Sequence, residues 1–127
     1  MENKIFTLHK TVTEADTAAH VGSGSLPVLA TPVLIAWMEA AACGCCAGLM
    51  EEGTTSVGTE MNMRHTAASP VGMKVTVTAE LTAGEGRILS FKVYAEDIAG
   101  AIGEGSHTRA IIRAERFMEK ANAKLAQ

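Results

Sequence analysis

The chain has 127 residues, of which 47% are hydrophobic, 4% are aromatic and 20% are charged. This length predicts one domain spanning residues 1–127, and the composition is that of an ordinary globular protein, which excludes a disordered, coiled-coil or collagen-like chain. The 11 basic and 14 acidic residues give a net charge of −3. Because nucleic-acid-binding domains usually carry a basic excess, we expect no nucleic-acid partner.

The first expected element is a strand at residues 4–12, where apolar and polar side chains alternate loosely. The opening residues contain no apolar run and no small-residue cleavage site, so we expect no secretory signal. Residues 13–30 contain two each of Gly, Ser and Thr, together with Asp16 and Pro27. They predict a long loop, of a length that is often functional, for example as a lid.

A long helix is predicted next, from Thr31-Pro32 to about residues 50–52, before Gly53. Threonine is a good N-cap, proline is favoured at the first helical position, and glycine commonly follows a helix end. The helix is apolar on all sides, which predicts that it is buried. Its apolar stretch is long enough to span a bilayer, but Glu39 near its middle would be costly there, so we expect no membrane span.

Four antiparallel strands are expected after the helix, with hairpin turns at residues 83–86 and 97–100. The predicted strands are residues 54–67, 74–82, 87–96 and 101–114, and a short charged helix follows from about Ala114. In the first of these strands, residues 57, 59, 61, 63 and 65 are expected to share one face. The next two strands carry an apolar residue at every second position, which predicts one buried face. One helix against an antiparallel sheet is an α+β layer architecture, and periodicity leaves open several arrangements of this class.

The three cysteines, Cys43, Cys45 and Cys46, all lie on the predicted helix. Neighbours on one helix rarely satisfy disulfide geometry, so we expect free thiols, a reducing cytoplasm and small buried side chains. A metal site normally needs a second ligand cluster, and the sequence offers only scattered histidines, so none is predicted.

Three residues could carry chemistry. Glu39 is the only charged side chain between Pro32 and Met50, and a charge in an apolar helix is expensive unless it is paired or protonated. It is therefore either a carboxylate at an exposed end or crevice, or a general base or nucleophile in a pocket. His65 is either a core or interface histidine or a site residue near a strand end. Thr31 is either a plain N-cap or a hydroxyl at the positive end of the helix dipole.

The segments LATPVLIAWMEAA (29–41) and VGTEMNMRHTAASPVGMKVTVTAEL (57–81) resemble the thioesterases related to fluoroacetyl-CoA thioesterase. That family combines a Thr-Pro helix start, a Glu on the helix and a His on the next strand, which map to Thr31, Glu39 and His65. A Gly early in the second strand and an Arg in the last strand, used for the acyl-CoA, map to Gly58 and Arg109. The resemblance covers nearly the whole chain and implies a hot dog fold, in which a five-stranded antiparallel sheet wraps a long central helix.

The resemblance further implies a hydrolase that cleaves a small or medium acyl-CoA thioester to a carboxylate and free CoA, without a cofactor. Glu39 would be the base or nucleophile, Thr31 an activated hydroxyl or substrate hydrogen-bonder, and His65 a proton shuttle that also contacts the substrate. The Gly58 backbone would approach the thioester, and Arg109 would bind the substrate. The family also implies a homodimer, or a dimer of dimers, with sites between subunits.

Two alternatives to hydrolysis stay open at this point: a non-catalytic acyl-CoA binding module, and a hot dog hydratase or dehydratase. Residues 13–30 contain no aromatic side chain, so the resemblance implies the reaction class and leaves the acyl group open. The end of the chain is basic, and this is either a solvated face or a binding site for the CoA phosphates. The basic residues there are Arg109, Arg113, Arg116, Lys120 and Lys124.

Overall fold

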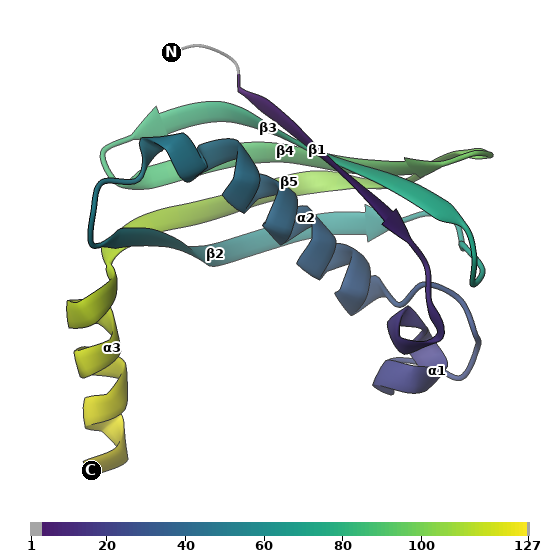
Figure 1. Cartoon of the computed structure of the whole chain (residues 1–127), viewed down its shortest axis with the longest axis horizontal. Coiled ribbons are helices and arrows are strands. Elements are labelled where there is room, and N and C mark those ends of the chain that lie inside the picture. Colours follow the sequence, from purple (N-terminus) through teal and green to yellow (C-terminus); the bar gives the residue numbers. More distant parts are fainter. Residues whose placement is uncertain (1–3, 127) are drawn as a thin grey trace.

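Five antiparallel strands form one sheet, and a long helix crosses one of its faces (Figure 1). The structure is a computed structural model that describes residues 4–126. The strands are β1 (Ile5–Thr11), β2 (Thr54–His65), β3 (Lys74–Glu85), β4 (Ile88–Asp97) and β5 (Gly100–Arg113), in the spatial order β1-β3-β4-β5-β2. The helix is α2 (Thr31–Cys46). This confirms the predicted hot dog architecture of a central helix and a five-stranded antiparallel sheet.

The core lies between α2 and the inner face of the sheet. The alternating residues that predicted a buried face on β3 and β4 are all buried: Val75, Val77, Ala79 and Leu81 on β3, and Leu89, Phe91, Val93 and Ala95 on β4. Leu34 and Met38 of α2 are fully buried against them. Within residues 4–126, Thr31–Leu49 is the one helical segment long and apolar enough to cross a membrane, and here it packs on the sheet.

The prediction that α2 is buried on every side is wrong for the single chain. Residues Ala36, Ala40 and Cys43 recur at helical spacing and are exposed, so a stripe of small side chains faces away from the sheet. The helix also ends earlier than predicted. It stops at Cys46, a 3-10 turn (η2, Ala47–Leu49) follows, and Gly53 lies in the turn that leads into β2.

The predicted face of β2 is also partly wrong, because this strand carries a β-bulge. Gly58 pairs with Arg109, but Glu60 pairs with Thr108, so Thr59 is an extra residue. Before the bulge, even-numbered residues such as Ser56 and Gly58 face α2, and after it Met61, Met63 and His65 do. Residues 57 and 59 therefore do not share the face of residues 61, 63 and 65.

Residues 13–30 are more ordered than the predicted loop. They contain a 3-10 turn (η1, Glu14–Asp16) and one short helix (α1, Ala18–Val21), beside the start of α2 in Figure 1. The amides of Ala18 and Ala19 donate to the carbonyls of Val28 and Leu26, so the segment closes on itself. The amide of Leu29 donates to the carbonyl of Ser69, which ties this segment to the body of the domain.

The chain ends in helix α3 (Ala114–Ala123), as predicted, followed by a 3-10 turn (η3, Lys124–Ala126). Figure 1 shows α3 extending away from the sheet. None of its residues is buried, and Phe117 and Met118 leave 41% and 51% of their surface exposed.

Gly105 is predicted to be essential for the close pairing of β2 and β5. A Cβ atom there would collide with the backbone of Asn62 and Met63, which cannot move without disturbing the ladder. We expect Gly105→Ala to lower the free energy of unfolding by about 1–3 kcal/mol, as overpacking usually does. Chemical denaturation measures this. Gly48→Ala is the control, because a Cβ there finds only the end of Lys4 at 3.6 Å. Equal stabilities of the two variants would contradict the prediction.

Candidate active site

The carboxylate of Glu39 lies beside a buried guanidinium. Nη1 of Arg109 on β5 donates to Oε2 of Glu39 at 3.3 Å, and this bond joins the middle of α2 to the sheet. The Glu39 side chain is 41% exposed and the Arg109 side chain 7%. Glu39 is therefore paired on its inner side and open to a ligand on its outer side, which is the arrangement a pocket carboxylate needs.

The other hydrogen bonds of Arg109 go to protein groups. Nε donates to the hydroxyl of Ser56 at 2.8 Å, and Nη2 donates to the carbonyl of Ser56 at 3.1 Å. A guanidinium fixed in this way orients the Glu39 carboxylate. We therefore expect a positioning role for Arg109, whereas the sequence predicts direct substrate binding.

Gly58 makes room for this pair. It sits on β2 opposite Arg109, at the start of the bulge. A Cβ atom on Gly58 would collide with Oε2 of Glu39 and would lie 3.3 Å from Nη1 of Arg109. Only glycine therefore lets the Glu39 carboxylate reach the sheet, and the structure brings together three of the predicted site residues, Glu39, Gly58 and Arg109.

His107 completes the cluster, and the sequence analysis did not identify it. It is 2% exposed, and its Nδ1 lies 2.7 Å from the carbonyl oxygen of Glu60. A carbonyl only accepts, so Nδ1 carries the proton and Nε2 accepts from Nη1 of Arg109 at 3.1 Å. Burial, and next the positive charge of Arg109, lower the pKa of His107, which keeps the ring neutral.

Thr31 and His65 form a second pair. Oγ1 of Thr31 lies 2.8 Å from Nδ1 of His65, across the junction of α2 and the end of β2. The prediction that Thr31 is the N-cap is wrong: Ala30 is the N-cap residue and Thr31 is the first helical residue. The hydroxyl therefore does not cap the helix and is available to His65.

The second ring nitrogen of His65, Nε2, is left without a hydrogen-bond partner among residues 4–126, although it is buried. Burial lowers the pKa of His65, so a neutral ring is favoured. Thr31 and His65 line a hollow of about 290 Å³ together with aliphatic and hydroxyl side chains. The aliphatic residues are Ala18, Val28, Leu29, Ala67 and Ala68, and the hydroxyl residues are Ser23 and Thr66.

The two clusters are separate within one chain. Eight helical residues place Thr31 about 12 Å from Glu39 along the axis of α2. Direct contact between the two clusters in one chain is therefore not expected. The sequence could have identified His107 and Ser56, since His107 precedes Arg109 by two residues and Ser56 precedes Gly58 by two, but their partners depend on the strand pairing.

Comparison with known proteins places this chain among thioesterases. Residues 12–115 match a family model described as fluoroacetyl-CoA-specific thioesterase. The fluoroacetyl-CoA thioesterase of Streptantibioticus cattleyicolor is 46% identical over 100 residues, which are 79% of this chain and 69% of that protein.

Solved structures agree. A structure of the fluoroacetyl-CoA thioesterase FlK superposes with a TM-score of 0.92 at 39% identity, covering 98% of this chain and 97% of that chain. A Thermus thermophilus hypothetical protein described as a thioesterase superfamily member superposes with a TM-score of 0.89 at 26% identity, over 99% of this chain and 96% of that one.

The buried neutral histidines predict a loss of stability in acid. The pKa values of His65 and His107 are lowered from the ordinary value of 6.5, so between the folded and unfolded pKa values the unfolded chain binds more protons. The free energy of unfolding should therefore fall as the pH drops below about 6.5 and should level off below the folded pKa values. His107→Gln should show a weaker pH dependence in chemical denaturation. A pH dependence equal to that of the wild type would refute the assignment.

Proposed function

Because the chain belongs to the fluoroacetyl-CoA-specific thioesterase family, it is an acyl-CoA thioesterase, and we propose that it cleaves small or medium acyl-CoA thioesters to a carboxylate and free CoA. The observation that carries this proposal is the half-exposed Glu39 carboxylate, held by Arg109 in an otherwise apolar helix. The arrangement fits hydrolysis, which needs a base or nucleophile fixed beside a carbonyl carbon.

Glu39 can act in hydrolysis either as a general base or as a nucleophile. As a general base, it takes a proton from water while the water oxygen bonds to the carbonyl carbon. As a nucleophile, its own oxygen bonds to that carbon, and water then hydrolyses the resulting anhydride. In either case the carbon–sulfur bond breaks and the CoA sulfur leaves as a thiolate that takes up a proton. Arg109 fixes the carboxylate throughout, and Ser56 and His107 fix Arg109.

Thr31 and His65 would serve the other side of the thioester. In a neutral His65, Nδ1 accepts a hydrogen bond from the Thr31 hydroxyl, and the buried Nε2 then carries the ring proton. This Nε2–H can donate to a substrate or relay a proton to the leaving sulfur. The Thr31 hydroxyl lies in the first turn of α2, where the helix dipole stabilises developing negative charge. These proposed roles of Thr31 and His65 follow from their contacts, and substitution of either residue can test them.

The acyl group fits the hollow beside Thr31 and His65. Its volume of about 290 Å³ and the five aliphatic side chains among its nine lining residues suit a short acyl chain. Residues 13–30 add no aromatic side chain to it. We therefore propose that short acyl groups enter here, without assigning a preference for a fluorinated one.

We further propose a homodimer, or a dimer of such dimers, in which each active site takes residues from two chains. Three features support this proposal: the separation of Glu39 from the Thr31–His65 pair, the exposed small-residue stripe on α2, and the edge position of β2. An edge strand next to an exposed helix face offers backbone and apolar surface to a second copy.

A reducing compartment such as the cytoplasm suits the thiols. Cys43, Cys45 and Cys46 are all free, and burial raises the pKa of both Cys45 and Cys46. Raised thiol pKa values keep these sulfurs protonated and unreactive, which fits a structural role.

Release of free thiol from a panel of acyl-CoAs tests the activity. We expect turnover that is highest with short acyl chains, and we expect Glu39→Gln to lower kcat at least about 100-fold, as loss of a general base does. Glu52→Gln, which removes one exposed carboxylate, is the control and should retain full kcat. A well-folded Glu39→Gln enzyme with near wild-type kcat would disprove the role of Glu39. Absence of thiol release from every acyl-CoA would disprove the proposed function.

Mixing two inactive variants tests the shared site. In a dimer of Glu39→Gln and His65→Gln chains, one of the two sites combines an intact Glu39 with an intact Thr31–His65 pair. A random mixture should therefore recover roughly a quarter of wild-type kcat, because half of the dimers are mixed and each has one intact site. A mixture of Thr31→Ala and His65→Gln chains should stay inactive, since both changes affect the same half-site. No recovery in verified mixed dimers would show that each site belongs to one chain.

A further inference from the structure

His107 lies at the centre of the cluster around Glu39, and its ring is closed off from solvent. Its position on β5 pairs with Met61 on β2 and with Phe91 on β4, and the residue is 2% exposed. Any influence of His107 on the reaction therefore has to pass through a neighbouring side chain. The contacts of its two ring nitrogens show which side chain this is.

The β-bulge of β2 holds one nitrogen of the ring. Nδ1 donates to the carbonyl of Glu60 at 2.7 Å, and Glu60 directly follows the extra residue of the bulge, Thr59. The Phe91 ring packs beside the imidazole, with the two ring centroids 6.1 Å apart. A buried ring with such neighbours has little freedom to turn, so the position of its Nε2 atom is fixed.

The other ring nitrogen, Nε2, shares one nitrogen of Arg109 with Glu39. Nη1 of Arg109 lies 3.1 Å from Nε2 of His107 and 3.3 Å from Oε2 of Glu39. Nη1 carries two hydrogens, so each acceptor takes one. Nε and Nη2 of the same guanidinium donate to Ser56, so four of its five N–H groups have partners within residues 4–126. His107 therefore occupies the hydrogen of Nη1 that Glu39 does not take.

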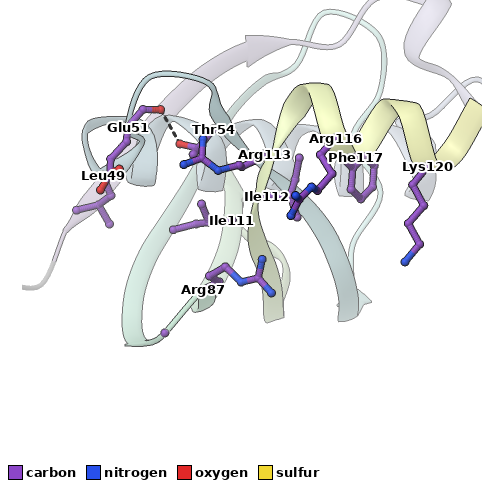
Figure 2. A pocket seen from close by; sticks show the side chains of 11 residues that line it. Leu49, Glu51, Thr54, Arg87, Ile111, Ile112, Arg113, Arg116, Phe117 and Lys120 are labelled. Atoms are coloured by element: carbon purple, nitrogen blue, oxygen red, sulfur yellow. Dashed lines mark hydrogen bonds between the residues drawn. The ribbon is translucent and has the colours of Figure 1, made fainter.

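Arg113, four residues further along β5, has a different environment. It is exposed and lines an open hollow of about 580 Å³ with Arg87 and Arg116, and Figure 2 shows these three side chains along the hollow. Arg109 is only 6% exposed. Because a buried donor without an acceptor is costly, the acceptor on His107 helps to keep the Arg109 guanidinium inside the domain.

His107 can accept from Arg109 only while its ring is neutral, because a protonated ring has no acceptor. The charged groups that face the ring are Arg109 on the same strand and Glu39 on α2, whose Oε2 lies 3.9 Å from Nε2. β2 contributes the Glu60 carbonyl and β4 the Phe91 ring. Burial lowers the pKa of His107, and the charge of Arg109 acts in the same direction. These surroundings favour a neutral ring with its proton on Nδ1.

We propose that His107 is a positioning residue of the thioesterase reaction, whose neutral ring takes one hydrogen of Arg109 Nη1 and thereby directs the other to the Glu39 carboxylate. This inference rests on the proposed function and adds a residue to it. Without the acceptor, the guanidinium can turn, and the carboxylate moves with it. A displacement of about 1 Å at a reacting group can cost about 100-fold in rate.

Two amide variants separate the two hydrogen bonds of the ring. The amide oxygen of glutamine is three bonds from Cβ and reaches the place of Nε2, whereas the amide nitrogen of asparagine is two bonds away and reaches the place of Nδ1. His107→Gln therefore keeps an acceptor for Arg109, and His107→Asn keeps only the donor to Glu60. We expect His107→Asn to lower kcat at least about tenfold with KM within about twofold of the wild type, because Arg109 acts on the reacting carboxylate. His107→Gln should retain at least about a third of kcat.

Further variants exclude a merely structural role. His107→Leu removes both bonds and should lose as much kcat as His107→Asn. His9→Asn and His9→Gln change an exposed histidine on β1 and should leave kcat and KM as in the wild type. Denaturation curves give the folded fraction of each variant, and kcat is taken per folded enzyme. An equal loss of kcat in His107→Gln and His107→Asn, or near wild-type kcat in His107→Leu, would overturn the proposal.

Nitrogen-15 NMR of the histidine rings tests the proposal apart from turnover. At the pH of the activity assay, His107 should carry its proton on Nδ1 and none on Nε2, and its signals are those that disappear in His107→Gln. A proton on Nε2 of His107 would overturn the proposal even in a fully active enzyme. The expected ring state in a protein that releases no thiol from any acyl-CoA would instead overturn the proposed hydrolysis and support the arrangement of His107 and Arg109.

Discussion

The bond between Glu39 and Arg109 is the contact on which the site depends. A carboxylate on an apolar helix needs a cation close by, and a buried guanidinium needs acceptors for its donors. Both needs are met because α2 crosses the sheet where β5 carries Arg109 and β2 carries Ser56. The helix therefore cannot slide or rotate on the sheet without separating the buried Arg109 guanidinium from its carboxylate partner, Glu39.

The strands were predictable because their signal is local. On β3 and β4 every second residue is apolar, and that pattern alone identifies the buried face. The short helix Ala18–Val21 was missed because four residues are too few to show a helical period and the turn-like residues 22–25 follow them. Contacts with a later segment hold it, such as the bond from the amide of Ala18 to the carbonyl of Val28. The N-cap was predicted one residue too late, at Thr31 and not at Ala30. Proline is accepted at either of the first two helical positions, so the Thr-Pro pair does not decide whether threonine lies before the helix or inside it.

For the candidate site, the sequence supplied the members and not their contacts. Thr31, Glu39, His65, Gly58 and Arg109 were identified from residue types and family resemblance. What the sequence does not contain is the pairing of β2 with β5, which places His107 against Arg109 and the Glu39 carboxylate over Gly58. The structure therefore divides the five residues into two clusters, and this division is the physical basis for expecting a site shared between chains.

The bulge at Thr59 also determines which residues of β2 face helix α2. On a regular strand, two residues face the same side only when an even number of positions separates them, yet Gly58 and His65 both face α2 and are seven positions apart. The extra residue of the bulge, Thr59, allows both to face the same side across an odd number of positions. Deleting one residue between them would leave every amino acid type of the site in the sequence, but it would turn either Gly58 or His65 to the outer face. Chain length in this short interval is therefore as much a part of the active site as the side chains themselves.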